Sequence, residues 1–263
     1  PITSSRLVGR KASANGAAGA EWNRSSMVVV SEVRENGHHS SPEGTRINRP
    51  TTMYTPAPHS PHGIHTVAQL DALFGPVGEV SLKKEVPFIH PHYRAMIEAS
   101  PFVVLATSGP GGLDASPRGD PPGFVVVQDE HTLLLPERRG NNRVDSLRNI
   151  LADPRVALLF LIPGGGETLR VNGRASITVD PALLQRFAVD GKPPQCVLNI
   201  QVDTVYFQCA RAIQRSRLWQ PVAPDARPAV PTAGTILAAL TQDQIDGQAY
   251  DAALPARQQA TLY

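Results

Sequence analysis

The sequence predicts a mainly β protein, a small antiparallel barrel with peripheral helices. Apolar runs of strand length follow one another between about residues 102 and 209, and Gly- and Pro-rich turns separate them. Helical periodicity is confined to short segments around and between these runs. Because no strand–helix–strand repeat is present, a doubly wound dinucleotide fold is excluded, and closure of the sheet into a barrel would remove its exposed edges.

Tight turns join most of the predicted strands. Residues 102–107 and 113–117 flank the turn 108–112 (SGPGG), which predicts a hairpin. Residues 156–162 (VALLFLI) contain no polar position, and this pattern predicts a strand that is buried on both faces. The other predicted strands are residues 123–127, 132–135, 168–179, 195–202 and 203–209.

Several short helices are expected. In residues 66–74, Val67 and Leu70 belong to one apolar helical face, Thr66 is a candidate N-cap, and Gly75 ends the helix. The other predicted helices are residues 90–99, 144–151, 181–188, 210–218, 236–240 and 244–253.

The chain divides into four segments by composition. Residues 1–60 are rich in Ser, Asn, Gly, Arg and His and have no sustained periodicity, so we expect a disordered tail. Met53 is a candidate natural start, since the sequence opens on Pro. A helical lead-in at 61–100, a barrel domain at 101–221 and a C-terminal helical extension at 222–263 follow.

Composition argues against several classes of function. A net charge of +2 provides no overall field for nucleic acid or a membrane surface. Cys196 and Cys209 are too few for a disulfide framework and predict free thiols. No apolar run approaches the roughly 20 residues of a membrane helix, and the start lacks a secretory signal, so we expect a cytoplasmic protein. No metal site is expected, because the clustered histidines lie in or beside the tail: His38, His39, His59, His62 and His65.

The segment 137–143 (ERRGNNR) is the strongest candidate binding site. It joins a strand to a helix and carries Arg138, Arg139 and Arg143. Backbone N–H groups at a helix start and guanidinium forks both suit a phosphate dianion. Asn141 or Asn142 could cap the helix at residue 144. Taken alone, the segment is more typical of a solvated basic loop.

Three further groups could carry chemistry. Arg118, in the stretch DASPRGD, leaves one strand near the start of another and could reach the same phosphate, although a surface turn is the alternative. Arg170 and Arg174 alternate on one face of a strand, which could face solvent or a ligand. In the segment RAIQRSRLW, three residues share one helical side and could contact a planar ring or an anion, or simply pack the extension: Arg215, Ser216 and Trp219.

The order of these motifs resembles a known family. A strand with SPRG, two strands, ERRGNNR with its helix, an apolar strand, VNGRA and then RSRLW is similar to the pyridoxamine 5′-phosphate oxidase-like flavoproteins. More narrowly, it resembles a bacterial subgroup of FMN-binding split-barrel proteins. The resemblance spans roughly residues 87–221 and rests on the spacing of four motifs.

The resemblance implies a six-stranded antiparallel split barrel that pairs as a homodimer, with flavin mononucleotide (FMN) in a groove between the two chains. It assigns the phosphate to Arg138, Arg139, Asn142 and Arg143, and adds Arg118 from the preceding strand pair. It implies that a segment of the partner chain reaches the flavin through Arg215, Ser216 and Trp219. The substrate-binding residues of a true pyridoxamine 5′-phosphate oxidase are not recognisable.

The expected function is therefore an FMN-dependent oxidoreductase that passes hydride between a nicotinamide or small-molecule substrate and the flavin. No catalytic acid, base or nucleophile is assigned, because no Ser-His-Asp or Cys-His arrangement stands out. The alternatives are a reductase that uses the deazaflavin F420, and a non-catalytic flavin-binding or storage module. A nucleic-acid-binding Arg loop is disfavoured by the small net charge.

Overall fold

A computed structural model describes residue 60 and residues 62–226 and 229–263. The expected tail at 1–60 lies outside the described residues except for residue 60, as do His38, His39 and His59. The described residues all belong to one unit, Arg49–Tyr263, and everything below concerns that unit. Among the described helices, none is long and apolar enough to cross a membrane.

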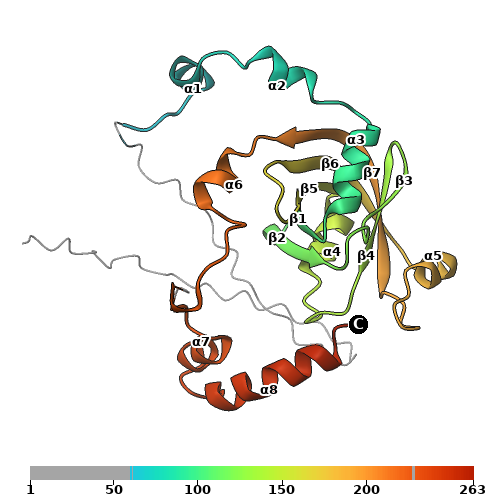
Figure 1. Ribbon diagram of the computed structural model, residues 1–263, viewed down its shortest axis with the longest axis vertical. Helices are drawn as coiled ribbons and strands as arrows, with labels where there is room; N and C mark the ends of the chain where they lie inside the picture. The colour runs from blue at the N-terminus through green and yellow to red at the C-terminus, as the bar shows by residue number, and fades with distance from the viewer. Residues whose placement is uncertain (1–59, 61, 227–228) are drawn as a thin grey trace, which may run out of the picture. The chain divides into compact units, whose positions relative to one another are not determined.

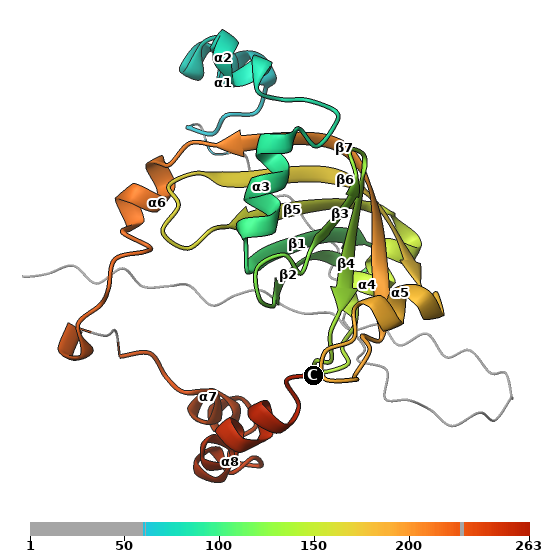
Figure 2. The same ribbon diagram turned by 45° about the vertical axis from the view of Figure 1, so that its right-hand side comes forward.

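One antiparallel sheet dominates the fold, in the order β2-β1-β5-β6-β7-β4-β3 (Figures 1 and 2). The mainly β prediction is confirmed, but the strand number is seven rather than six. Among the described residues no pairing joins the edge strands β2 and β3, so the sheet is not closed by hydrogen bonds. The strands are β1 Phe102–Gly109, β2 Gly112–Gly119, β3 Val126–Asp129, β4 Thr132–Glu137, β5 Arg155–Leu161, β6 Thr168–Thr178 and β7 Cys196–Gln208.

The two strands expected at 195–202 and 203–209 form the single strand β7. Its pairing with β6 shifts at Asp203: Asn172 is opposite Thr204, whereas Gly173 is opposite Val202. Asp203 is therefore the extra residue of a β-bulge, which bends a strand without ending it. A Cβ on Gly173 would lie 2.3 Å from the Gln201 carbonyl oxygen, so the glycine of the VNGRA motif allows the two backbones to approach.

The core lies on one face of the sheet, beneath α3 (Pro91–Ala99) and α4 (Asp145–Ala152). Figure 2 shows α3 crossing the strands on this face. Ile97 of α3 and Ile150 of α4 belong to the same buried cluster as Leu105, Phe160 and Val171 of the strands. Although α3 lies in the expected lead-in segment, it fills the sheet's core.

The opposite face of β5 is only half-buried, contrary to the prediction for VALLFLI. Val156, Leu158 and Phe160 face the core, while Ala157 and Leu159 retain partial exposure on the other face. Successive side chains of a strand point to opposite faces of the sheet, and only the core face packs against α3 and α4. At the β4–β7 end the outer face is covered, because Leu134 and Val197 pack there with Phe187, which follows α5 (Pro181–Arg186).

The remaining helices precede β1 or follow β7 in the sequence. α1 (Val67–Phe74) has the expected Thr66 cap, and α2 (Glu79–Lys83) is a helix that the sequence pattern did not predict. α6 (Arg211–Ser216) and a short 3₁₀ turn, Pro224–Ala226, follow β7. α7 (Ala233–Leu240) and α8 (Gly247–Ala260) are longer than expected; Asp246 caps α8 by accepting from Gln248 N and Ala249 N.

Candidate functional site

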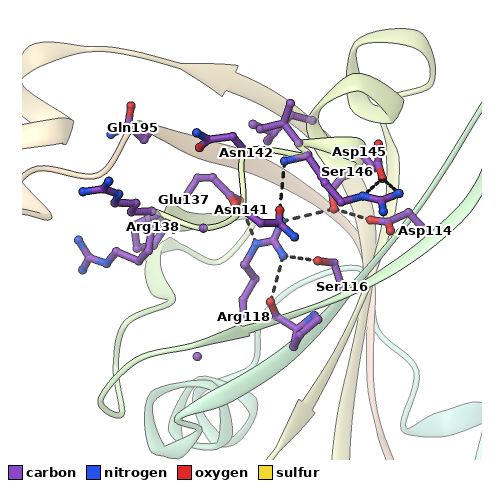
Figure 3. A pocket seen from close by; sticks show the side chains of 18 of the residues that line it. Asp114, Ser116, Arg118, Glu137, Arg138, Asn141, Asn142, Asp145, Ser146 and Gln195 are labelled. Carbon is purple, nitrogen blue, oxygen red and sulfur yellow. Dashed lines mark hydrogen bonds and ion pairs between the residues drawn. The ribbon is translucent and has the colours of Figure 1, made fainter. Parts of the chain in front are cut away.

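A pocket of about 540 Å³ lies where β2, the end of β4 and the start of α4 meet (Figure 3). Its volume falls within the ~300–1,000 Å³ of typical small-molecule sites. Five of the residues expected to bind the cofactor line it: Arg118, Arg138, Arg139, Asn142 and Arg143. The β3–β4 hairpin separates β2 from the segment 137–143, called the Arg loop below, and the fold brings both to one cavity.

Arg118 is held in the pocket wall by a polar network (Figure 3). Its Nε donates to Glu137 Oε2 at 2.9 Å, and its Nη1 donates to Ser116 Oγ at 2.6 Å. Its Nη2 donates to Ser146 Oγ at 3.3 Å, and that buried hydroxyl donates to Asp114 Oδ2 at 2.6 Å. This network joins β2, β4 and α4, so it fixes the geometry of the pocket wall.

Burial shifts the protonation of two groups beside this network. Burial raises the pKa of Glu137 above its usual 4.5, although the Arg118 guanidinium opposes the shift. Burial also raises the pKa of the Cys196 thiol, and the nearby Glu137 charge adds to that effect. The thiol is therefore kept in its unreactive protonated form.

Arg138 also lines the pocket and is held by fixed partners. Its Nε donates to Asp120 Oδ2 at 2.8 Å, and its Nη1 donates to the Phe187 carbonyl at 2.6 Å. The ring of Tyr263 lies over its guanidinium, 5.5 Å from Cζ. These contacts restrict Arg138 to one orientation at the edge of the pocket.

Arg139 and Arg143 are the exposed cations of the pocket. Arg139 makes no hydrogen bond or ion pair with another residue in the described part of the chain, so its charge is available to a ligand. Arg143 donates through Nε and Nη2 to Asp145 Oδ2, at 3.1 and 3.0 Å. That pair is open to solvent, with the Arg143 side chain 51% exposed, so it restrains Arg143 weakly.

The start of α4 faces this pocket without a side-chain cap. Neither asparagine caps it as predicted: Asn141 Oδ1 accepts from Arg143 N instead, and the N-cap residue is Val144. Val144 has φ 48°, a left-handed conformation that is strained for a β-branched residue. Such strain is typical of ligand-binding loops, and the first-turn N–H groups lack a cap side chain to satisfy them.

The remaining predicted residues do not line this pocket in the single chain. Arg215 and Ser216 end α6, where Ser216 Oγ donates to the Ile213 carbonyl, and Trp219 Nε1 donates to the Gly165 carbonyl at 2.7 Å. Their expected role in a partner's site stays a prediction. On β6, the Arg170 guanidinium lies over the Tyr206 ring, 5.2 Å from its centroid.

Sequence reasoning did not identify several residues of the pocket wall. Asp114 and Ser116 precede Arg118 in the DASPRGD stretch, and alternation along β2 could have placed both beside it. Asp120, which holds Arg138 from outside the lining, was also not identified. Ser146 has no local signal, because its role depends on β2 lying against α4. Tyr263 lies 143 positions from its partner Asp120, beyond the reach of any local pattern.

Comparison with known proteins identifies the family. The family model described as pyridoxamine 5′-phosphate oxidase matches residues 89–209. This segment, which holds β1 to β7 and the loop at 137–143, is the part of the chain that belongs to the pyridoxamine 5′-phosphate oxidase-like split-barrel family, as the sequence motifs predicted.

Solved structures similar to this chain match less than half of it, at low identity. HupZ of Group A Streptococcus is 17% identical, with a TM-score of 0.39, and the match covers 46% of this chain and 94% of that one. A putative pyridoxamine 5′-phosphate oxidase from Lactobacillus delbrueckii is 20% identical (TM-score 0.38; 46% and 95% covered). A protein described as FAD-binding, from Mesorhizobium loti, is 16% identical (TM-score 0.31; 43% and 87%). No curated protein matches the chain.

Proposed function

We propose that this chain binds FMN and that its phosphate lies at the mouth of the Arg loop. One observation carries the proposal: the uncapped start of α4 and the exposed side chains of Arg139, Asn142 and Arg143 line a single pocket. A phosphate dianion accepts hydrogen bonds and does not donate them, and every one of these groups can donate. Arg139 provides a positive charge that no described side chain neutralises.

The acidic side chains of the pocket do not prevent this fit, because each already has a donor. Glu137 accepts from Arg118, Asp114 accepts from Ser146, and Asp145 accepts from Arg143. An arriving phosphate would compete only for the exposed Arg143, since Arg118 is fixed in the wall. The fixed network then orients the loop, and the exposed cations contact the ligand.

FMN, once bound, would supply the redox chemistry, so we propose an oxidoreductase that acts on a small-molecule substrate or a nicotinamide. The protein would contribute the position of the cofactor and the charge around it. Membership of the oxidase-like family supports this class over a storage module. The free thiols Cys196 and Cys209 suit a reducing compartment, and we propose the cytoplasm.

We further propose a homodimer that pairs through the outer face of β1, β5 and β6. Val104, Leu159 and Leu161 leave part of their apolar surface exposed there, whereas the buried residues on the other face of these strands pack in one cluster with α3 and α4. The unbroken apolar run of β5 is typical of a strand that is covered on both faces. A second copy of the chain would provide the second cover, and family membership supports that partner.

The absorption spectrum of the purified chain with added FMN tests the proposed cofactor. We expect uptake of FMN at one per chain, and bleaching of the bound flavin by NAD(P)H or another reductant substrate. A chain that takes up no FMN contradicts the proposal. If the chain binds FMN but neither NADH nor NADPH reduces the bound flavin under anaerobic conditions, the storage module is supported instead.

A further inference from the structure

The end of the C-terminal extension lies against the proposed cofactor pocket. Leu262 and Tyr263 follow α8 and line the same cavity as the Arg loop. The Tyr263 hydroxyl donates to Asp120 Oδ1 at 2.6 Å, and its ring lies over the Arg138 guanidinium. Since Tyr263 and Asp120 are 143 positions apart, the contact is a tertiary feature and not a consequence of local sequence.

The acceptor of this hydrogen bond is a buried and already oriented carboxylate. The Asp120 side chain is 3% exposed, and its two oxygens have different donors: Oδ2 accepts from Arg138 and Oδ1 accepts from Tyr263. Hydrogen bonds to an ionised acceptor are stronger than neutral ones. The hydrogen bond to Asp120 raises the pKa of Tyr263, so the hydroxyl keeps its proton and remains a donor at neutral pH.

We infer that Leu262 and Tyr263 form a wall of the ligand site and that Tyr263 is the positioning residue that holds this wall on Asp120 and Arg138. The inference rests on the FMN site proposed above. It assigns Arg138 a second role, because the same guanidinium that edges the pocket supports the Tyr263 ring. It also gives the extension at 222–263 a function, which neither its composition nor its helical pattern indicated.

Ligand binding and docking of this wall are coupled if the ligand touches both. A ligand held by Arg139 and Arg143 on one side and by Leu262 on the other must lose the second contact when Tyr263 undocks. Undocking therefore provides a route for release. By thermodynamic reciprocity, a bound ligand favours the docked wall to the same extent that the docked wall favours the ligand.

Two variants separate the parts of the contact. Tyr263→Phe removes the hydroxyl donor to Asp120 and keeps the ring over Arg138, whereas Tyr263→Ala removes both. Tyr250→Phe is the matched control, because Tyr250 lies on α8 with its ring against Arg257 and does not line the pocket. Thermal unfolding of each chain without ligand reports any purely structural effect.

The test is the rate of FMN release from the full chain, measured by stopped-flow displacement with flavin fluorescence. We expect release to be roughly 3- to 10-fold faster for Tyr263→Phe, the effect of about one hydrogen bond, faster again for Tyr263→Ala, and unchanged for Tyr250→Phe. If wild type binds FMN and all variants release it equally fast, the wall is not part of the site and the proposed function stands. If wild type takes up no FMN, the proposed function and this inference both fail.

Discussion

Gly173→Ala should strongly destabilise the sheet, because the bulge between β6 and β7 leaves no room for a side chain. The added Cβ would lie 2.3 Å from the Gln201 carbonyl oxygen, where contacts under 3.0 Å force a shift. The strands must therefore separate by roughly 0.7 Å (3.0 − 2.3) at their bulge. Overpacking of this kind costs about 1–3 kcal/mol, and a weakened ladder hydrogen bond adds about 1 kcal/mol.

We therefore expect a loss of about 2–4 kcal/mol in the free energy of unfolding, or roughly 4–16 °C in Tm. Chemical denaturation followed by circular dichroism measures it. Gly119→Ala is the matched control, since a Cβ there meets its nearest atom, the Pro101 carbonyl oxygen, at an ordinary 3.4 Å. Equal stability of Gly173→Ala and Gly119→Ala would refute the close approach of β6 and β7 at the bulge.

Three further predictions concern the pocket wall and the outer face. Arg118→Ala should destabilise the fold by about 3 kcal/mol, because Glu137 loses its partner while remaining buried. The same substitution should raise the pKa of Glu137 further, and NMR titration of that carboxyl measures the change; an unchanged pKa contradicts the pairing. Because the folded-state pKa of Glu137 is raised, its contribution to stability is complete below about pH 4.5 and is lost as the pH rises through the folded pKa. Glu137→Gln should therefore flatten the fall in unfolding free energy as the pH rises above 4.5, and an unaltered slope would exclude this carboxyl as the cause. Leu159→Glu on the outer face should convert the proposed dimer into a monomer in sedimentation, whereas Leu151→Glu, at an exposed position of α4, should not; a dimer that persists in both argues for a different interface.

The alternation of apolar residues was enough to predict the sheet, because each strand buries one face in a regular register. It could not show that residues 195–209 form one strand, since the bulge at Asp203 interrupts the alternation and imitates a boundary. The apolar run of β5 predicted burial on both faces, and the single chain covers only one of them. An unbroken apolar run predicts that both faces of a strand are covered, but it does not show whether the cover comes from the same chain or from another.

The Arg loop was predictable as a pocket element, because its basic residues are adjacent in sequence and lie between a strand and a helix. The different roles of the pocket's arginines could not be predicted. Arg118 is committed to Glu137 and Arg138 to Asp120, whereas Arg139 remains without a described partner. These pairings join distant segments, so only the tertiary structure distinguishes the arginines that build the wall from those that remain exposed in the pocket.

The central claim is that the exposed arginines of the loop hold a phosphate, and the affinity of the chain for FMN relative to riboflavin tests it most directly. Riboflavin lacks the phosphate and is otherwise the same ligand, so titration of wild type, Arg139→Ala and Arg143→Ala with both flavins isolates that contact. We expect wild type to prefer FMN, and each substitution to weaken FMN by about tenfold or more while leaving riboflavin nearly unchanged. Equal losses for the two flavins, or no preference in wild type, would contradict the phosphate assignment.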